Sequence, residues 1–181
     1  PNAEEASIFS RLNINTFSCV PPFIQMAGKA ALENGANREN IAAMRLKFEE
    51  RRNFIVEALN RIEGIHCIKP QGAFYTYPNI TGVCMRIGAI EAADELSNSC
   101  AAATTPSALF QVFLLYRYGV ASLDGNSFGD SSDANRYYLR ISIASGTEEL
   151  KEGVRRIDLA AKDVDGFKSF LAEIKLGRQK L

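Results

Sequence analysis

The sequence predicts a mixed α/β fold, in which a long helix leads into a C-terminal α+β domain. Apolar residues recur at helical spacing between residues 38 and 63, where an amphipathic helix would place them on one face. Residues 137–144 instead alternate apolar and polar side chains, which is typical of a strand with one buried face. Helical spacing returns after residue 145, so we expect helices and strands to share one core.

The composition is that of a globular protein without a strongly charged partner. Hydrophobic residues make up 46% of the 181 residues and charged residues 23%, so a packed core is expected. Lys plus Arg and Asp plus Glu both total 21, and this balance gives no reason to expect binding to nucleic acid or an anionic membrane. The most apolar stretch, residues 108–115, is too short to span a bilayer.

The cysteines show no metal-binding pattern. Cys19, Cys67, Cys84 and Cys100 include no CxxC pair, and the single histidine, His66, has no cysteine, serine or acid pattern around it. We therefore predict no metal site, a structural role for His66, free buried thiols and a reducing, cytoplasmic location.

The N-terminal third predicts two helices. Pro21 and Pro22 suit the start of a helix that Asn34 and Gly35 end. A longer helix should run from about Arg38 to Glu63, with Gly64 as its C-cap. At about 39 Å for about 26 residues, this helix exceeds the diameter of a small domain, so we expect it to join two domains. Its apolar stripe consists of Ile41, Met44, Phe48, Ile55, Leu59 and Ile62.

Two strands are predicted next, at residues 65–68 and 72–77, around the turn Lys69-Pro70-Gln71. Residues 86–107 are polar and rich in alanine, which suggests a helix and then a loop broken at Thr104-Thr105-Pro106.

A further helix should run from Pro106 to about Tyr118 and end at Gly119. It leads to a short strand at residues 120–123 and a polar, exposed loop that extends through Asp133.

The C-terminal part predicts a strand and two helices. The strand is residues 137–144, and Ser145 with Glu148 forms a plausible capping box for the helix that follows. A last helix spans residues 167–176. The expected core residues of these two helices are Leu150, Val154, Ile157 and Ala161, and Phe167, Phe170, Leu171 and Ile174.

Arg140 lies in the middle of the predicted strand 137–144, between Leu139 and Ile141. An arginine there is costly unless its planar guanidinium meets a carboxylate or phosphate, which it can hold through two parallel hydrogen bonds. The alternative is a surface arginine that points at water.

Two other segments have both a functional and a structural interpretation. The aromatic run 74–77 can line a pocket, but a core strand is the more frequent explanation for such a run. The loop 123–129 can bind an anion through its backbone amides, but it lacks the arrangement of a phosphate-binding P-loop, and a plain turn also fits.

Several motifs, in order, strongly resemble the class I/II aminotransferases, especially their aspartate aminotransferase-like branch. The motifs are Phe48-Glu49-Glu50-Arg51-Arg52-Asn53, Pro70-Gln71-Gly72-Ala73-Phe74-Tyr75, Tyr118-Gly119-Val120-Ala121, residues 125–129 and Tyr138-Leu139-Arg140-Ile141-Ser142. The resemblance implies a pyridoxal-phosphate-dependent transferase of fold type I. Residues 1–36 would then be the end of its large, cofactor-binding domain, residues 37–64 the connecting helix and residues 65–181 the small domain.

The resemblance also implies roles for single residues. Arg140 corresponds to the arginine that binds the α-carboxylate of the substrate, and Gly72 and Phe74 lie near the substrate. Such enzymes are homodimers, and Thr16 and Ser18 match a segment that lies near their cofactor and subunit interface. The enzyme would transfer an amino group between an amino acid, aspartate or a similar one, and a 2-oxo acid.

The lysine that holds pyridoxal phosphate in such enzymes has no counterpart in this chain. It precedes a G-x-R motif that should lie just upstream of Pro1, and the chain starts at Pro1 without methionine, so we expect a cut N-terminus and a C-terminal fragment. Without this lysine the fragment alone should be inactive.

The loop at residue 124 departs from the family, because relatives usually have proline there and this chain has Asp124. A buried aspartate beside a carboxylate substrate would be unfavourable, so we predict that Asp124 faces solvent.

Two other functional classes stay open. One is the aminotransferase-like ligand-sensing domain of a transcription regulator, and the other is a stand-alone module in which Arg140 docks a partner's carboxylate. The identity of the amino donor and the ability of the fragment to dimerise do not follow from the sequence.

Overall fold

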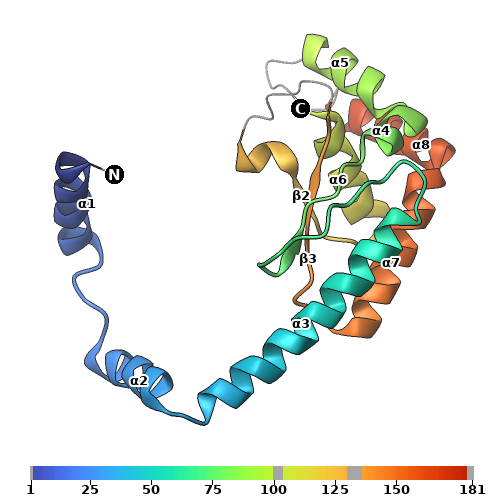
Figure 1. Cartoon of the computed structure of the whole chain (residues 1–181). Helices are drawn as coiled ribbons and strands as arrows, with labels where there is room; N and C mark the ends of the chain where they lie inside the picture. The colour runs from blue at the N-terminus through green and yellow to red at the C-terminus, as the bar shows by residue number, and fades with distance from the viewer. Residues whose placement is uncertain (1, 100–103, 130–135, 179–181) are drawn as a thin grey trace. The chain divides into compact units, whose positions relative to one another are not determined.

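The computed structural model describes residues 2–99, 104–129 and 136–178 (Figure 1). The chain forms two compact units, Pro1–Arg45 and Leu46–Leu181. Cys100, the loop around Asp133 and Lys180 lie outside the described residues. No helix within the described ranges combines the length and the hydrophobicity needed to cross a bilayer.

The first unit contains helices α1 (Ala3–Thr16) and α2 (Pro22–Glu33) and the start of α3 (Asn37–Asn60). The predicted helix after Pro21 is confirmed by α2, in which Pro22 is the first residue. Helix α1 was not predicted, although Asn2 and Glu5 cap each other's backbone amides at its start. Neither α1 nor α2 contains a buried residue, and large apolar side chains such as Phe17 and Leu32 are exposed.

Helix α3 confirms the predicted long helix but ends at Asn60 rather than at Glu63. The Asn60 side chain accepts a hydrogen bond from the amide of Cys67 and donates one to its carbonyl, both over 2.9 Å, which holds the chain as it turns away. Gly64 is therefore not the C-cap; it lies in this turn with φ of +87°, and a Cβ there would lie 2.8 Å from the backbone of Gly82.

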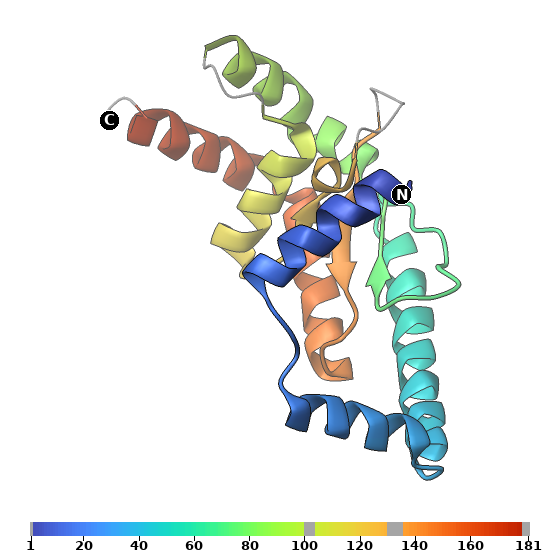
Figure 2. The same cartoon turned by 90° about the vertical axis from the view of Figure 1, so that its left-hand side faces the viewer.

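The second unit is built on a three-stranded antiparallel sheet. Its strands are β1 (Tyr75–Thr76), β2 (Leu123–Asp124) and β3 (Leu139–Ser142), in the order β1-β3-β2. Figure 2 shows β1 beside β3. Tyr75 pairs with Ser142, and Leu123 pairs with Arg140.

The predicted strands before β3 were too long. Residues 65–68 contribute a single bridge, from His66 to Asn79, and the strand predicted at 72–77 is reduced to β1. The strand predicted at 120–123 shifts to β2, because the amide of Val120 bonds to the carbonyl of Leu114 at the end of a helix instead of to a neighbouring strand.

Helices cover one face of this sheet. They are α4 (Thr81–Ile87), α5 (Ala89–Ser99), α6 (Pro106–Tyr118), α7 (Thr147–Lys162) and α8 (Val164–Arg178). Helix α6 confirms the prediction at both ends, since Thr105 caps its start and Gly119 its end. Helix α4 was not predicted.

Helix α7 confirms the predicted core stripe, but its N-cap is Gly146, which lies one residue after Ser145. The amide of Gly146 donates to Glu149 over 3.0 Å, so the pair Ser145 and Glu148 does not cap it. Phe167 and Phe170 of α8 are buried as predicted, and the Phe113 ring of α6 packs against both.

Strand β3 is shorter than the predicted strand 137–144, but the predicted alternation is confirmed, since Leu139, Ile141 and Ile143 are buried among the helices. Of the described cysteines, Cys67 and Cys84 are free and buried as predicted, whereas Cys19 is free but exposed.

Candidate functional site

The guanidinium of Arg140 lies against two aromatic rings. Its Cζ atom is 4.2 Å from the centre of the Tyr75 ring and 4.1 Å from the centre of the Phe128 ring. Both distances are those of favourable cation–π contacts. Within the described residues no carboxylate or carbonyl accepts a hydrogen bond from Arg140, so none of these residues occupies its N–H groups.

The sheet places Arg140 on the face opposite the core. Successive side chains of a strand point to opposite faces, and Leu139 and Ile141 are buried, so Arg140 projects from the other face. Tyr75 pairs with Ser142 and therefore shares the Arg140 face. In Figure 1, α7 and α8 lie to the right of β3 and the 3-10 helix η1 (Gly125–Phe128), which ends with Phe128, lies to the left.

Gly125 fixes the start of η1. Its amide donates to the Tyr138 carbonyl over 2.9 Å, and its carbonyl accepts a hydrogen bond from the Tyr77 hydroxyl over 3.0 Å. A Cβ at this position would lie 2.7 Å from the Tyr77 hydroxyl oxygen and 2.9 Å from the Cβ of Tyr138. Only glycine fits here without a shift of its neighbours, so the turn that carries Phe128 has a defined starting point.

Tyr77 reaches Gly125 as a neutral phenol. Its ring stacks on that of Tyr138, with ring centres 5.0 Å apart. Burial, and then the charge of Asp124, raises the pKa of Tyr77 above its usual value near 10. The protonated hydroxyl donates its hydrogen bond to the Gly125 carbonyl.

Asp124 points inward, and the prediction that it faces solvent was wrong. Its Oδ2 accepts a hydrogen bond from the Thr105 hydroxyl over 3.1 Å, and its amide donates to the side chain of Gln111 over 2.8 Å. Its Oδ1 is buried without a hydrogen-bond partner. The hydrogen bonds from Thr105 and Gln111 offset the cost of burying Asp124, and the sequence does not show these partners. Burial, and then the charge of Asp124, raises the pKa of Cys84 to about 12.

Phe74 lies next to the rings that contact Arg140, and Gly72 lies two residues before it. The Phe74 ring centre is 4.4 Å from that of Tyr75, and its side chain is 45% exposed. Gly72 is exposed, and a Cβ added to it would meet no atom within 4 Å, while Ala73 between Gly72 and Phe74 has a left-handed φ of +62° that turns the chain. Their predicted place near the substrate stays a prediction.

Thr16 and Ser18 belong to the first unit. The Thr16 hydroxyl, at the end of α1, donates to the carbonyl of Leu12 over 2.8 Å. Ser18 follows with a left-handed φ of +60°. Both side chains are exposed, and their predicted role near a cofactor stays a prediction.

Sequence reasoning missed Tyr75 and Phe128 as partners of Arg140. Tyr75 was part of the aromatic run 74–77, for which a core strand was the favoured explanation. Phe128 lies in a turn without strand or helix periodicity. A chemical signal was available. A mid-strand arginine can be stabilised by aromatic rings as well as by an acidic residue, and aromatic residues occur in the segments beside the strand.

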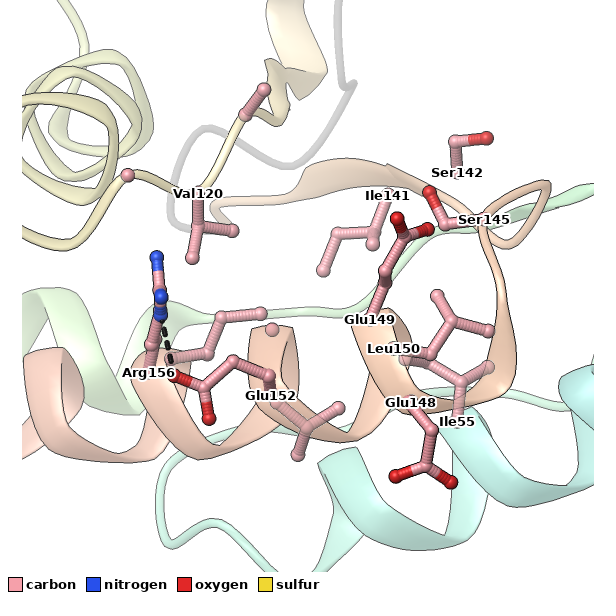
Figure 3. Close-up of a pocket in the computed structure, with 15 residues that line it drawn as sticks. Ile55, Val120, Ile141, Ser142, Ser145, Glu148, Glu149, Leu150, Glu152 and Arg156 are labelled. Atoms are coloured by element: carbon pink, nitrogen blue, oxygen red, sulfur yellow. Dashed lines mark hydrogen bonds and ion pairs between the residues drawn. The ribbon is translucent and has the colours of Figure 1, made fainter.

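A cavity of about 540 Å³ lies on the other side of the sheet and does not include Arg140. Figure 3 shows Val120 and Ile141 on one side of it and Glu149 and Glu152 of α7 on the other. Arg156 also lines the cavity but is paired with Glu152, and Glu148 and Glu149 leave an excess of negative charge, so this cavity is a poor site for a carboxylate ligand.

The described lysines do not form a reactive amine site. A lysine that forms a Schiff base works in a desolvated pocket. Every lysine whose side chain the structure describes is exposed, namely Lys29, Lys47, Lys69, Lys151, Lys162 and Lys168.

Comparison with known proteins gives consistent relatives. The family described as aminotransferase class I and II matches residues 5–157. A probable aspartate/prephenate aminotransferase of Aquifex aeolicus (strain VF5) is 32% identical over 161 residues, which are 89% of this chain and 35% of that protein. An aspartate aminotransferase of Rhizobium meliloti is 36% identical over 145 residues, which are 80% of this chain and 31% of that protein. The chain thus spans about a third of the length of these curated relatives.

Solved structures agree with these relatives. An aromatic aminotransferase from Pyrococcus horikoshii OT3 matches with a TM-score of 0.64 and 27% identity, over 86% of this chain and 35% of that one. The aspartate aminotransferase from Rhizobium meliloti matches with a TM-score of 0.60 and 30% identity, over 83% of this chain and 33% of that one.

Proposed function

The chain belongs to the class I and II aminotransferase family, and we propose that it is the C-terminal part of an enzyme that transfers an amino group between an amino acid and a 2-oxo acid. The predicted transferase fold is confirmed by the structural relatives, which are aminotransferases. The named relatives favour aspartate or a similar amino acid as the donor. They favour the enzyme over a regulator, because each is called an aminotransferase.

The N–H groups of Arg140, from which no side chain or carbonyl of the described residues accepts a hydrogen bond, carry this proposal. Amino acids and 2-oxo acids share a carboxylate next to the reacting carbon, and a planar guanidinium can hold that carboxylate through two parallel hydrogen bonds. Tyr75 and Phe128 contact the guanidinium but do not use these donors. Arg140 would therefore bind and orient the substrate.

The described residues of this chain do not by themselves fit pyridoxal phosphate. The cofactor supplies an electron sink for amino-group transfer and needs a lysine in a desolvated pocket, whereas the described lysines are exposed. The proposed enzyme would supply that lysine from outside this chain. The chain alone is then inactive.

The remaining predicted roles follow from the same family. Gly72 and Phe74 would border the substrate, and Thr16 and Ser18 would lie near the cofactor and the subunit interface of a homodimer. The exposed apolar side chains of α1 and α2 support an interface on that unit. The free thiols of Cys19, Cys67 and Cys84 support a cytoplasmic location.

The proposal is tested by titrating the ¹⁵N-labelled chain with sodium acetate, using sodium chloride at equal ionic strength as the blank. We expect saturable shifts of the Tyr75 and Ser142 amide signals, because acetate carries the shared carboxylate. Arg140→Lys should need at least about tenfold more acetate for half-saturation, since lysine keeps the positive charge but lacks the planar guanidinium that makes two parallel hydrogen bonds. Arg155→Lys, on the exposed face of α7, is the matched control and should bind acetate as the unchanged chain does. Equal acetate affinity in Arg140→Lys would contradict the role of Arg140.

A second measurement tests the missing lysine. Mixing the chain with pyridoxal phosphate should give no absorbance of a lysine aldimine beyond that of free lysine, and no turnover of an amino acid. An aldimine band together with turnover would show that this chain already contains the catalytic amine.

A further inference from the structure

We propose that Tyr75 and Phe128 are positioning residues that hold the guanidinium of Arg140 ready for a carboxylate, and that the loop 124–128 is built to place Phe128 for this purpose. The two residues are called the aromatic clamp below. This inference rests on the proposed function of Arg140, but its test separates the two.

The clamp limits the freedom of a flexible side chain. A free arginine has several rotatable bonds, and fixing them on binding a ligand costs conformational entropy. Here two aromatic rings lie 4.2 and 4.1 Å from the Arg140 Cζ atom and hold it by contacts within the chain itself. The clamp contacts the cation through ring faces, which attract it without using its N–H donors. A carboxylate would therefore bind to a guanidinium that is already oriented and whose N–H donors the two rings do not use.

The loop before Phe128 is anchored independently of Arg140. At Asp124, the carboxylate accepts from Thr105 and the amide donates to Gln111, which ties the loop to α6. At Gly125, hydrogen bonds to Tyr138 and Tyr77 tie the loop to the residue before β3 and the residue after β1, in a space that excludes a Cβ. Phe128 follows three residues later and remains 48% exposed. An exposed phenylalanine gains little from core burial, so its contact with Arg140 explains the position of the ring.

The clamp is tested on the same ¹⁵N-labelled chain, with the Arg140 side-chain Nε–H signal as a direct readout. A proton near the faces of aromatic rings is shielded, so this signal should lie upfield of the other arginine Nε–H signals before acetate is added. In Phe128→Ala and Phe128→Leu it should move back toward them, and the acetate dissociation constant should rise about fivefold, as the loss of one cation–π contact implies. Phe128→Tyr retains a ring and should restore both values.

Tyr116→Ala is the matched control, because Tyr116 is an aromatic side chain of the same unit that is 77% exposed and lies on α6. It should change neither value. Phe128→Leu removes the ring but keeps most of the apolar volume, so it tests the clamp even if Phe128→Ala lowers the stability of the chain. If Phe128→Ala and Phe128→Leu bind acetate as tightly as the unchanged chain, or if the Arg140 signal is not shielded, the clamp is wrong while the role of Arg140 stands. If acetate does not bind the unchanged chain, the proposed function itself is wrong.

Discussion

Thr105 donates a hydrogen bond from its hydroxyl group to Oδ2 of Asp124 over 3.1 Å, and this bond joins the start of α6 to strand β2. The same Thr105 oxygen accepts a hydrogen bond from the amide of Ala108 and so caps α6. Thr105→Val and Asp124→Ala should each lower the free energy of unfolding by about 1–3 kcal/mol. The double variant should lose about 1 kcal/mol less than the sum, because the two residues share one bond. Urea unfolding of the four proteins measures this coupling.

The exposed pair Lys162 and Asp158 on α7 is the matched control. Its coupling, measured in the same way, should stay below about 0.5 kcal/mol, since exposed ion pairs contribute little. Strictly additive losses for Thr105→Val and Asp124→Ala would mean that their bond does not tie β2 to α6.

Gly125→Ala should lower the free energy of unfolding by about 1–3 kcal/mol, because the new Cβ would lie 2.7 Å from the Tyr77 hydroxyl oxygen and 2.9 Å from the carbonyl oxygen of Tyr138. Chemical denaturation monitored by circular dichroism tests this. Gly153→Ala is the control, since nothing lies within 4 Å of its Cβ and alanine suits the interior of α7, which should gain about 0.5–1 kcal/mol. A Gly125→Ala protein as stable as the unchanged chain would show that this turn has room to relax.

Tyr118 gives a pH-dependent prediction. Its hydroxyl donates to Asp163 Oδ2 over 2.6 Å, and burial, followed by this bond and the Asp163 charge, raises the pKa of Tyr118 from 10 to about 12. A pKa raised by folding stabilises the protein fully below the unfolded value near 10, and this contribution is lost as the pH rises through 12. Tyr118→Phe should therefore cost about 1–2 kcal/mol near neutral pH, and the difference should shrink above about pH 10.

The measurement is urea unfolding of both proteins at about pH 8, 10 and 11.5. Tyr116→Phe, on the exposed face of α6, is the control and should show no such change. A difference between Tyr118→Phe and the unchanged chain that stays constant over this range would exclude the Tyr118 proton as its source.

Elements with local signals were predictable from the sequence. Thr105, Pro106 and Gly119 mark both ends of α6, and the alternation around Arg140 identifies β3 and its buried face. These features depend on neighbours within a few residues. The extents of β1 and β2 depend instead on which distant segment offers backbone partners, so they could not be predicted in the same way.

The arginine of the candidate site could be predicted from the sequence, but the residues that surround it could not. The cost of a mid-strand charge identified Arg140, but Tyr75 and Phe128 approach it from distant parts of the sequence. Asp124 shows the same limit, because its polarity suggested solvent while Thr105 and Gln111 supply partners that only the folded chain brings together.

The most direct measurement is kcat/KM for amino-acid substrates in the proposed full-length enzyme, with Arg140→Lys compared with the control Arg155→Lys. If Arg140 binds the substrate carboxylate, Arg140→Lys should lower kcat/KM by at least about tenfold, and Arg155→Lys should leave it unchanged. An unchanged kcat/KM in Arg140→Lys would contradict the assignment of Arg140 as the carboxylate-binding residue.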